Sequence, residues 1–354
     1  MSLLSKYLMR VILTSTLLVL LVLLALAVLF EFIGQVDDVQ GDFGILQALL
    51  FAVLRLPQLS FEMMPVAALI GSLLGLGVLA NNSELVVMRT AGVSVVRLAG
   101  MVALSGVTLM IATALIGEFI GPPLDYFARN MRDEARHGNQ GRDVGNAAWV
   151  KDGPIMLHLE RVNTDFNFGS VYLFRFNEDH TLRSIAIAEN SAIDENDKWI
   201  LENFRETRFL DDGVQVVSSA LAIESLHIDS DVLGISLVKP ISLSARGLMT
   251  YINYLKTNDL KAIRYEMELW SRVATTATVA IMPVLALAFV FGSLRSSGAG
   301  GRLMIGVMIG LGYFLASETL SSSGQVFDLD PALVTSLPTI VLLMITVFAL
   351  SRVH

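Results

Sequence analysis

The stretch Asn-Asn-Ser-Glu-Leu-Val-Val-Met-Arg-Thr-Ala-Gly, residues 81–92, separates two hydrophobic runs that are each long enough to cross a bilayer. Ser83 is a residue type that caps helices, Glu84 complements the positive end of a helix dipole, and Gly92 can close the helix. A short helix that carries apolar and charged side chains can dock into a groove on a soluble partner. The alternative is an interfacial turn that only reconnects the two spans, and composition alone slightly favours it.

The composition of the chain is that of a membrane protein. Of its 354 residues, 54% are hydrophobic and 16% are charged. The absence of cysteine excludes a disulfide framework and thiolate metal or redox sites. A formal net charge of -8 argues against nucleic acid as a partner. The five histidines show no ligand spacing, so we expect no metal and no catalytic group in this chain.

Six hydrophobic runs predict six membrane-spanning helices. The second run, residues 47–80, would measure roughly 50 Å as a straight helix, well beyond a hydrocarbon core of ~30 Å. We therefore expect it to bend or project from the membrane, with Pro57 as the bend. The first run is too long for a signal peptide, which indicates an uncleaved anchor. The runs lie at about residues 11–33, 47–80, 98–120, 269–291, 303–321 and 331–350.

The basic residues of the short connecting segments all fall on one side of this arrangement, and the segments on the other side carry only acids. The positive-inside rule then places both termini in the cytoplasm and the large connection, residues 124–265, outside. The basic residues that decide the orientation are Lys6, Arg10, Arg89, Arg97, Arg295, Arg302 and Arg352.

Residues 124–265 have the pattern of a separate soluble domain. Residues 124–137 favour a polar helix that carries Arg129, Arg132 and Arg136 on one face. After this helix the hydrophobic period becomes two and turn signals separate short runs, which predicts an antiparallel sandwich or jelly roll. The strand-like runs are residues 148–150, 155–159, 170–176, 182–188, 199–209 and 214–228, and residues 259–268 are expected to form a helix.

Two features inside the spans carry further information. Small-residue spacing at Gly71 and Gly75, and again at Gly306 and Gly310, predicts close contacts between helices. Charged side chains within or at the ends of spans are costly in lipid, so they are candidate functional groups, although an interfacial anchor explains each of them as well. These residues are Glu31, Glu62, Glu118, Arg272 and Glu318.

Several segments together resemble the LptF/LptG permease family, with a match that runs the whole length in the order three spans, external domain, three spans. The length of the chain and Ser-Glu-Leu-Val-Val-Met at residues 83–88 are more similar to the LptG branch than to the LptF branch. The other segments are Ala91-Gly92, Ile116-Gly117-Glu118-Phe119, Ala128-Arg129-Asn130 with Arg132, residues 265–272 with Trp270-Ser271-Arg272, and Phe-Val-Phe-Gly-Ser-Leu-Arg at residues 289–295.

The resemblance implies an α-helical membrane protein with an inserted periplasmic all-β, jellyroll-like domain. Residues 1–123 would hold the first three spans with a coupling helix at residues 83–92, residues 124–265 the β-domain, and residues 266–354 the last three spans. The implied function is that of a permease subunit in the ABC exporter that extracts lipopolysaccharide from the inner membrane of Gram-negative bacteria.

The same resemblance implies a set of partners. An LptF-like permease and an LptG-like permease form a heterodimer around a lipid cavity, and two LptB-like subunits in the cytoplasm bind and hydrolyse ATP with magnesium. Proteins similar to LptC and LptA form the periplasmic bridge. The first and fifth spans form a lateral gate. The chain itself would be no enzyme and would hold no cofactor.

The resemblance also assigns candidate site residues. Glu84 corresponds to a charged contact with the ATPase, and guanidinium groups can hold lipid phosphates bidentately. Relatives carry lysines near the outer end of the first span, where this chain has acids, Asp37 and Asp38 among them. An acid there can act only through a divalent cation or a salt bridge, or not at all. The coupling candidates are Ser83, Glu84, Leu85, Val86, Met88 and Arg89, and the substrate candidates are Arg129, Arg132, Arg136, Arg272 and Glu31.

Two other functions stay open on the sequence. A membrane-anchored sensor or scaffold would bind an envelope ligand with its external β-domain and would need no ATPase. An integral membrane hydrolase that acts on envelope lipid ranks last, because no arrangement of a nucleophile with a base is recognisable in the sequence.

Overall fold

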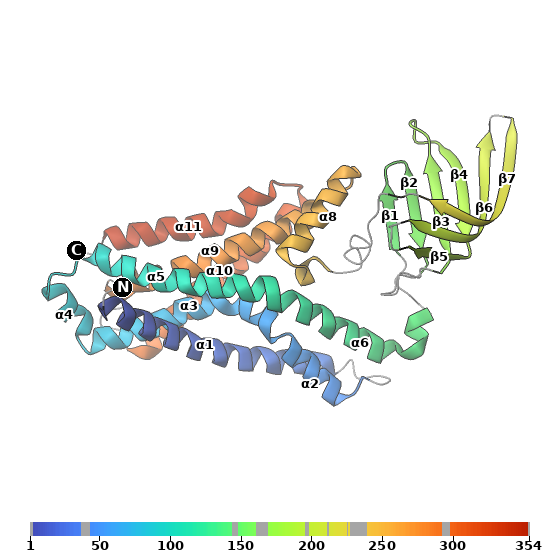
Figure 1. Cartoon of the computed structure of the whole chain (residues 1–354). Helices are drawn as coiled ribbons and strands as arrows, with labels where there is room; N and C mark the ends of the chain where they lie inside the picture. The colour runs from blue at the N-terminus through green and yellow to red at the C-terminus, as the bar shows by residue number, and fades with distance from the viewer. Residues whose placement is uncertain are drawn as a thin grey trace. The chain divides into compact units, whose positions relative to one another are not determined.

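The computed structural model describes residues 3–36, 43–143, 148–160, 169–194, 198–210, 212–224, 226, 239–291 and 298–352, except for the side chains of residues 134 and 136–143. The chain divides into two compact units (Figure 1). Met1–Val39, Ile45–Arg129 and Ile263–His354 form the unit that we call the membrane unit, and Gln40–Gly44 and Asn130–Ala262 form the β-unit. Asp37, Asp38 and Arg295, which entered the predictions, lie outside the described residues.

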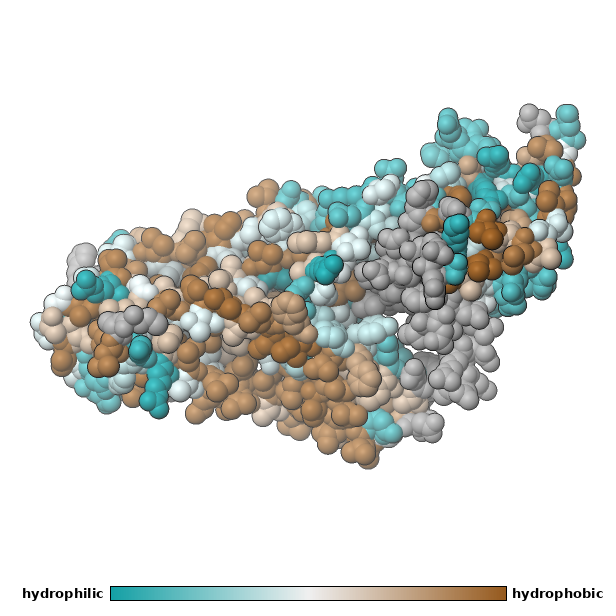
Figure 2. All heavy atoms as spheres, viewed as in Figure 1, coloured by the Kyte–Doolittle hydropathy of each residue, from teal (hydrophilic) through white to brown (hydrophobic). Residues whose placement is uncertain are grey.

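Six helices of the described chain are long and apolar enough to cross a membrane, which confirms the six predicted spans. Apolar residues cover most of the visible face of the helical part (Figure 2). The third span continues through a π-helical turn, Ile116–Ile120, into α6 (Gly121–Asp143). The spanning helices are α1 (Leu3–Val36), α3 (Leu56–Asn81), α5 (Val95–Leu115) with its continuation, α9 (Ile263–Phe291), α10 (Ala299–Val326) and α11 (Pro331–Ser351).

The long second run is two helices, as its length required. α2 (Ile45–Leu54) ends before Arg55, and α3 starts at Leu56. Pro57 lies in the first turn of α3, where backbone N–H groups have no partner within the helix, so the N–H that proline lacks costs no hydrogen bond. The N–H of Leu59 still donates to the carbonyl of Arg55 at 3.0 Å, so the interruption is one residue long. The run is therefore interrupted at Arg55, two residues before Pro57, where the bend was predicted.

Small residues set the distance between α3 and its neighbours. A Cβ at Gly75 would lie 2.8 Å from Oγ of Ser15 on α1, and a Cβ at Gly71 would collide with the backbone of α1. On the other neighbour, Gly306 and Gly310 of α10 face α3, and a Cβ at either would lie 3.0 Å from an α3 side chain. Both predicted close contacts are confirmed, and they seat α1 and α10 directly on α3.

The β-unit contains one curled antiparallel sheet among its described residues (Figure 1). One face is buried: Val150, Leu157, Leu173 and Ala186 lie opposite one another on four strands and are at most 3% exposed. The strands follow the order β1-β2-β3-β4-β6-β5, and β7 also pairs with β6. They are β1 (Ala148–Asp152), β2 (Ile155–Leu159), β3 (Val171–Phe176), β4 (Leu182–Ala188), β5 (Asn190–Ile193), β6 (Trp199–Leu210) and β7 (Gly213–Glu224).

The inserted β-domain is therefore confirmed. Each of the six predicted strands has a counterpart, and residues 225, 227 and 228 of the last one lie outside the described residues. β5 was not predicted, because its four residues are too few to show an alternating pattern. Its register against β6 pairs Asn190 with Glu202 and Ile193 with Trp199, so tertiary pairing and not local propensity defines it.

One helix was missed and another was predicted in the wrong place. α8 (Ala245–Thr257) was not predicted, although the side chain of Ser244 caps it by accepting the N–H of Gly247. The helix expected over residues 259–268 is wrong in its first part. Asp259 has a left-handed backbone (φ 53°) that ends the preceding helix, and the next one begins only with α9.

α8 covers part of β1, the strand at one edge of the sheet. The hydroxyl of Tyr254 accepts the N–H of Lys151 at 3.0 Å and donates to the carbonyl of the same residue at 2.9 Å. Asn258 adds a hydrogen bond to the N–H of Gly153. The two bonds of Tyr254 occupy backbone groups of β1 that an unpaired edge would offer to another strand, and the bond of Asn258 holds the turn after β1. A 3-10 turn, Pro240–Ser242, precedes the helix.

A buried carboxylate on the buried face of the sheet joins side chains of neighbouring strands. Glu206 on β6 has a side chain 5% exposed; it is paired with Arg175 and with Arg208 (2.7 Å) and accepts a hydrogen bond from Ser184 at 2.8 Å. Burial raises the pKa of Glu206, but these hydrogen bonds and the two guanidinium charges outweigh the burial and hold its pKa below the usual value.

We expect the β-unit to lose stability in acid through this carboxylate. A pKa lowered by folding stabilises the folded state above the ordinary glutamate value of about 4.3, and this stabilisation is lost as the pH falls through the folded pKa. Fluorescence of the fully buried Trp199, with Trp149 and Trp270 replaced by Phe, reports the transition in the full chain. Glu206→Gln should weaken the pH dependence, and Glu178→Gln on an exposed turn should not; equal profiles for both would refute the expectation.

Candidate functional site

The stretch at residues 81–92 forms a helix, α4 (Glu84–Thr90), between α3 and α5. Gly92 has φ 90°, its N–H donates to the carbonyl of Arg89, and the N–H of Val93 donates to the carbonyl of Met88. This pair of bonds is a Schellman motif, which satisfies the last carbonyls of the helix. The predicted closure by Gly92 is confirmed.

The start of α4 differs from the prediction. Ser83 occupies the N-cap position, but its backbone is left-handed (φ 59°, ψ 8°) and its side chain makes no capping hydrogen bond. Capping serines have an extended backbone that directs Oγ at the first N–H groups, and this geometry does not. The cap predicted for Ser83 is wrong. The residue instead makes the sharp turn from α3 into α4.

The coupling candidates divide between two sides of α4. Leu85 is 1% exposed and, with the partly buried Met88, packs into the core of the membrane unit. Val86 and Val87 are 43% and 63% exposed on the outer side. The guanidinium of Arg89, also exposed, lies 5.7 Å from the ring centroid of Phe291. Leu85 and Met88 therefore anchor the helix, and the two valines form an exposed apolar surface.

Glu84 is bonded to the first span. Its Oε2 accepts a hydrogen bond from the hydroxyl of Tyr7 on α1 at 2.7 Å, and its Oε1 is 3.5 Å from Nδ2 of Asn82. In the membrane unit the start of α1, the end of α11 and α4 lie at the same end of the bundle (Figure 1). The carboxylate that was predicted to contact the ATPase is thus also a link between α4 and α1.

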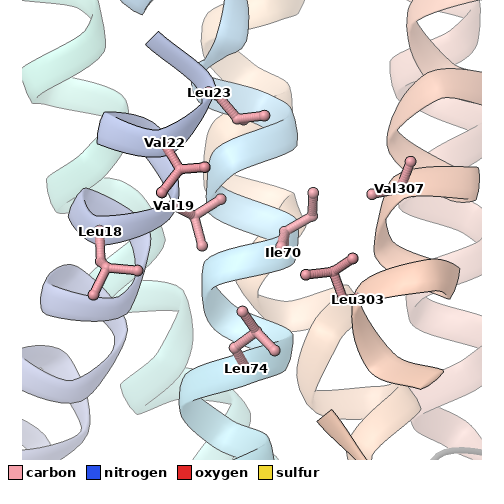
Figure 3. A pocket seen from close by; sticks show the side chains of 8 residues that line it. All are labelled: Leu18, Val19, Val22, Leu23, Ile70, Leu74, Leu303 and Val307. Carbon is pink, nitrogen blue, oxygen red and sulfur yellow. The ribbon is translucent and has the colours of Figure 1, made fainter. Parts of the chain in front are cut away.

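An apolar pocket of about 230 Å³ opens between three of the spans. Its walls are α1 on one side and α10 on the other, with α3 as the floor (Figure 3). All of its lining side chains are aliphatic, so it suits hydrocarbon and offers no polar contact. The lining residues are Leu18, Val19, Val22 and Leu23 from α1, Ile70 and Leu74 from α3, and Leu303 and Val307 from α10.

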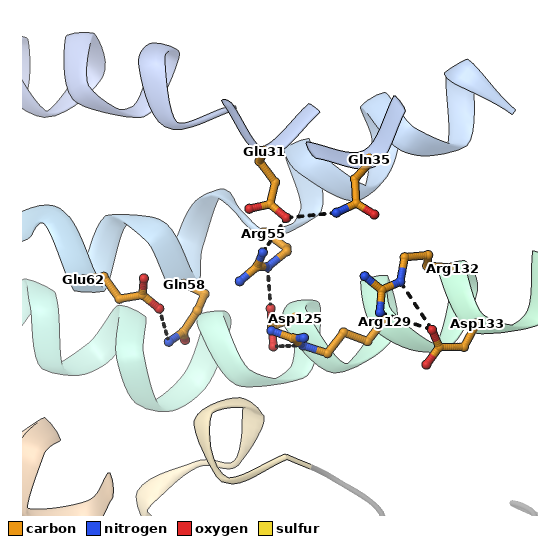
Figure 4. A network of polar contacts seen from close by, with 9 residues as sticks. All are labelled: Glu31, Gln35, Arg55, Gln58, Glu62, Asp125, Arg129, Arg132 and Asp133. Carbon is orange, nitrogen blue, oxygen red and sulfur yellow. Dashed lines mark hydrogen bonds and ion pairs between the residues drawn. The ribbon is translucent and has the colours of Figure 1, made fainter. Parts of the chain in front are cut away.

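A chain of ion pairs joins three helices of the membrane unit (Figure 4). Glu31 on α1 pairs with Arg55 at 2.6 Å, and Arg55 pairs with Asp125 on α6 at 2.9 Å. Asp125, whose side chain is 0% exposed, also pairs with Arg129 at 2.8 Å. Of the roles considered for Glu31, the structure shows the salt bridge. The four formal charges cancel, so this network serves first to hold the helices together.

Each substrate candidate with a described side chain is paired with an oppositely charged group. Arg129 is already paired within the network, and Arg132, in the β-unit, lies 3.3 Å from Asp133. The side chain of Arg136 lies outside the described residues. Arg272 is buried at 7% exposure in α9.

Arg272 supports the π-helical turn of the third span. Its Nη1 donates to the carbonyl of Gly117 in that turn at 3.1 Å, and its Nε pairs with Glu268 at 3.2 Å. The guanidinium also lies 5.9 Å from the ring centroid of Phe61 on α3. π-helical turns leave carbonyls that a neighbouring donor can satisfy. A buried arginine with these partners is a structural brace between α9, α3 and the third span.

Sequence reasoning missed two residues of the site. They are Asp125, which pairs with Arg55 and Arg129, and Tyr7, which donates a hydrogen bond to Glu84. Asp125 and Arg129 stand four residues apart on a helix, a spacing that predicts their ion pair. The other contacts join residues 70 or more positions apart, as in Arg55–Asp125 and Tyr7–Glu84, and no local pattern predicts them. Within the described ranges, no group of three or more His, Asp or Glu side chains is placed to hold a metal ion.

Six apolar spans, an aliphatic pocket between three of them and an inserted β-domain define a multi-pass membrane protein that can take hydrocarbon between its helices. The family described as lipopolysaccharide export system permease LptF/LptG matches residues 6–352. The chain is 31% identical over 355 residues to the lipopolysaccharide export system permease protein LptG of Escherichia coli strain K12, covering 99% of this chain and 98% of that protein. It is 30% identical over 351 residues, with the same coverage, to the protein of that name in Haemophilus influenzae. The chain therefore belongs to the LptF/LptG family of lipopolysaccharide export permeases.

Proposed function

We propose that this chain is the LptG-type transmembrane subunit that takes lipopolysaccharide out of the inner membrane and passes it to periplasmic carrier proteins. The observation that carries the proposal is the aliphatic pocket between α1 and α10, because it offers acyl chains a site within the spans. The family membership supports the same substrate.

The proposal includes partners that supply the second half of the cavity, the hydrolysis of ATP and the acceptance of the substrate. An LptF-like permease completes the cavity as a heterodimer, and two LptB-like subunits bind ATP and magnesium and hydrolyse the nucleotide. LptC-like and LptA-like proteins receive the substrate. The distribution of lysine and arginine supports an orientation with both termini and α4 in the cytoplasm and residues 124–265 in the periplasm.

In this proposal α4 is the element on which the ATPase acts. Val86 and Val87 provide its exposed apolar side, and Glu84 and Arg89 flank that side with opposite charges. Closure of the ATPase dimer moves α4, and the packed helices behind it rearrange between two states. α1 and α10 form the lateral gate, since they are the two walls of the pocket.

Fewer charged residues are candidates for direct contact with the substrate than the sequence indicated. Arg129 reaches a lipid phosphate only by exchanging its contact with Asp125, and Arg132 only by exchanging Asp133. Arg136 stays a candidate on its sequence position alone. Arg272 and Glu31 act on the substrate indirectly, by holding the helices that surround it.

Charge reversal at Glu84 tests the proposal. Glu84→Arg removes the acceptor of the Tyr7 bond and places a cation at the positive end of the α4 dipole, so we expect loss of ATPase co-purification in mild detergent. Glu84→Gln keeps an acceptor and should retain most assembly, and Lys6→Glu on the exposed start of α1 controls for a change of charge. Normal assembly and lipopolysaccharide transport with Glu84→Arg would contradict the role, and so would a functional chain that binds no ATPase, as a sensor or scaffold would.

A further inference from the structure

Two polar bonds join the two walls of the pocket to the junction between α3 and α4. On one side, Tyr7 of α1 donates to Glu84, the first residue of α4 (2.7 Å). On the other side, Nη2 of Arg302 of α10 donates to Oδ1 of Asn81, the last residue of α3 (2.9 Å). The two acceptors are three residues apart on either side of the left-handed turn at Ser83. A displacement of α4 therefore acts on both bonds together.

The side chain of Arg302 is held in one position by its surroundings. The side chain is 1% exposed, and it fits only because Gly77 of α3 has no side chain: a Cβ there would lie 2.7 Å from Cδ of Arg302. A buried cation is costly unless hydrogen bonds compensate for the lost water. The guanidinium is thus fixed in a slot against α3 and tied to Asn81, where it transmits motion instead of absorbing it.

The pocket residues lie between two polar attachment points on each wall. On α1 they fall between Tyr7 and Glu31, which pairs with Arg55. On α10 they fall between Arg302 and Tyr313, whose hydroxyl lies 2.8 Å from Oγ1 of Thr278 on α9. Each wall is therefore held at its far point by one bond and joined to the junction between α3 and α4 by the other.

We propose that Tyr7 and Arg302 are positioning residues that convert displacement of α4 into movement of α1 and α10, with Glu84 and Asn81 as their contact points. The inference rests on the proposed function, in which a nucleotide-hydrolysing partner moves α4. Motion of α4 pulls the near ends of both walls, while the bonds of Glu31 and Tyr313 hold their far points. Arg302 then moves together with the last turn of α3, both walls turn relative to the middle of α3, and the pocket changes width.

The test uses spin labels on this chain, which has no cysteine of its own, in a transporter whose partner subunits have had their cysteines replaced. Leu17→Cys on α1 and Met304→Cys on α10 are exposed positions beside the pocket, at 57% and 68% exposure. The distance between the labels is measured by electron double resonance in the full transporter, with its ATPase, in nanodiscs. Nucleotide-free and ATP–vanadate-trapped samples are compared.

The wild type should show a change in distance on trapping. Tyr7→Phe, which removes one hydroxyl, and Asn81→Ala should each reduce that change to about half or less of the wild-type value. Asn81→Asp keeps an acceptor for Arg302 and should restore it. Thr14→Val removes an α1 hydroxyl that bonds only to carbonyls of its own helix, and it should leave the change intact.

The possible outcomes distinguish a failure of the inference about Tyr7 and Arg302 from a failure of the proposed function. A wild-type change that persists undiminished in Tyr7→Phe and Asn81→Ala overturns this inference and leaves the proposed function in place. An Asn81→Asp variant that behaves like Asn81→Ala also overturns it, because the loss then reflects packing and not the bond. No change in the wild type, with the ATPase bound, overturns the proposed function and the inference with it.

Discussion

Replacing Asp125 by alanine is expected to destabilise the membrane unit by about 3–5 kcal/mol, the range for removing one partner of a buried ion pair. Asp125 is 0% exposed and pairs with both Arg55 and Arg129. Its removal leaves two guanidinium groups close together without their shared carboxylate. The contact between α6 and the start of α3 depends on that carboxylate, so this part of the membrane unit should open first.

Asp133 provides a matched control on the same helix. Its side chain is 58% exposed and lies 3.3 Å from Arg132, so Asp133→Ala should cost about 0–1 kcal/mol, as the loss of exposed pairs does. Thermal unfolding of both variants in the same detergent, followed by tryptophan fluorescence, measures the difference. If Asp125→Ala unfolds at the same temperature as Asp133→Ala, the network does not carry the stability assigned to it.

The second large effect is expected for Gly71→Leu. The space in front of Gly71 is filled by the backbone of α1 around Thr16, which cannot move aside as a flexible side chain can. Over-packing of a core commonly costs about 1–3 kcal/mol, and a collision with backbone should exceed that range. We expect α1 to be displaced from α3, with loss of thermal stability and of the pocket wall.

Gly100→Leu is the control for this substitution. Gly100 lies in α5 with no atom within 4 Å of the position of a Cβ, so the same side chain meets open space there. Its thermal stability should stay near that of the wild type. Equal stability of Gly71→Leu and Gly100→Leu would show that α1 does not seat on α3 at Gly71.

The sequence predicts the parts of this protein that depend on local patterns. Hydrophobic length predicts the spans, alternation predicts six strands, and Gly92 predicts the end of α4. Where a pattern is only four residues long, as in β5, or where a left-handed residue such as Asp259 moves a helix boundary, the prediction fails. Local patterns do not predict a backbone angle that tertiary packing determines. Ser83 is an example, because its left-handed backbone prevents the cap that its residue type predicted.

The candidate site was predicted in part. Glu84 and Arg129 were identified from their position, but their partners Tyr7 and Asp125 were not, and without the partners their roles change. Arg302 entered the sequence argument as a loop charge that sets the orientation, whereas the structure buries it against Gly77. A residue type shows that a charge is present, and only the packing of distant segments shows what the charge contacts.

Photo-crosslinking from the pocket tests the central claim most directly. A photoreactive phenylalanine analogue is placed at Val307 in the pocket wall, or at the 61% exposed Val347 of α11, in cells that express the complete transporter. The account predicts a lipopolysaccharide adduct at Val307 that decreases when ATP hydrolysis proceeds, and little adduct at Val347. An adduct of equal yield at both positions, or none at Val307, would contradict a pocket that holds the substrate.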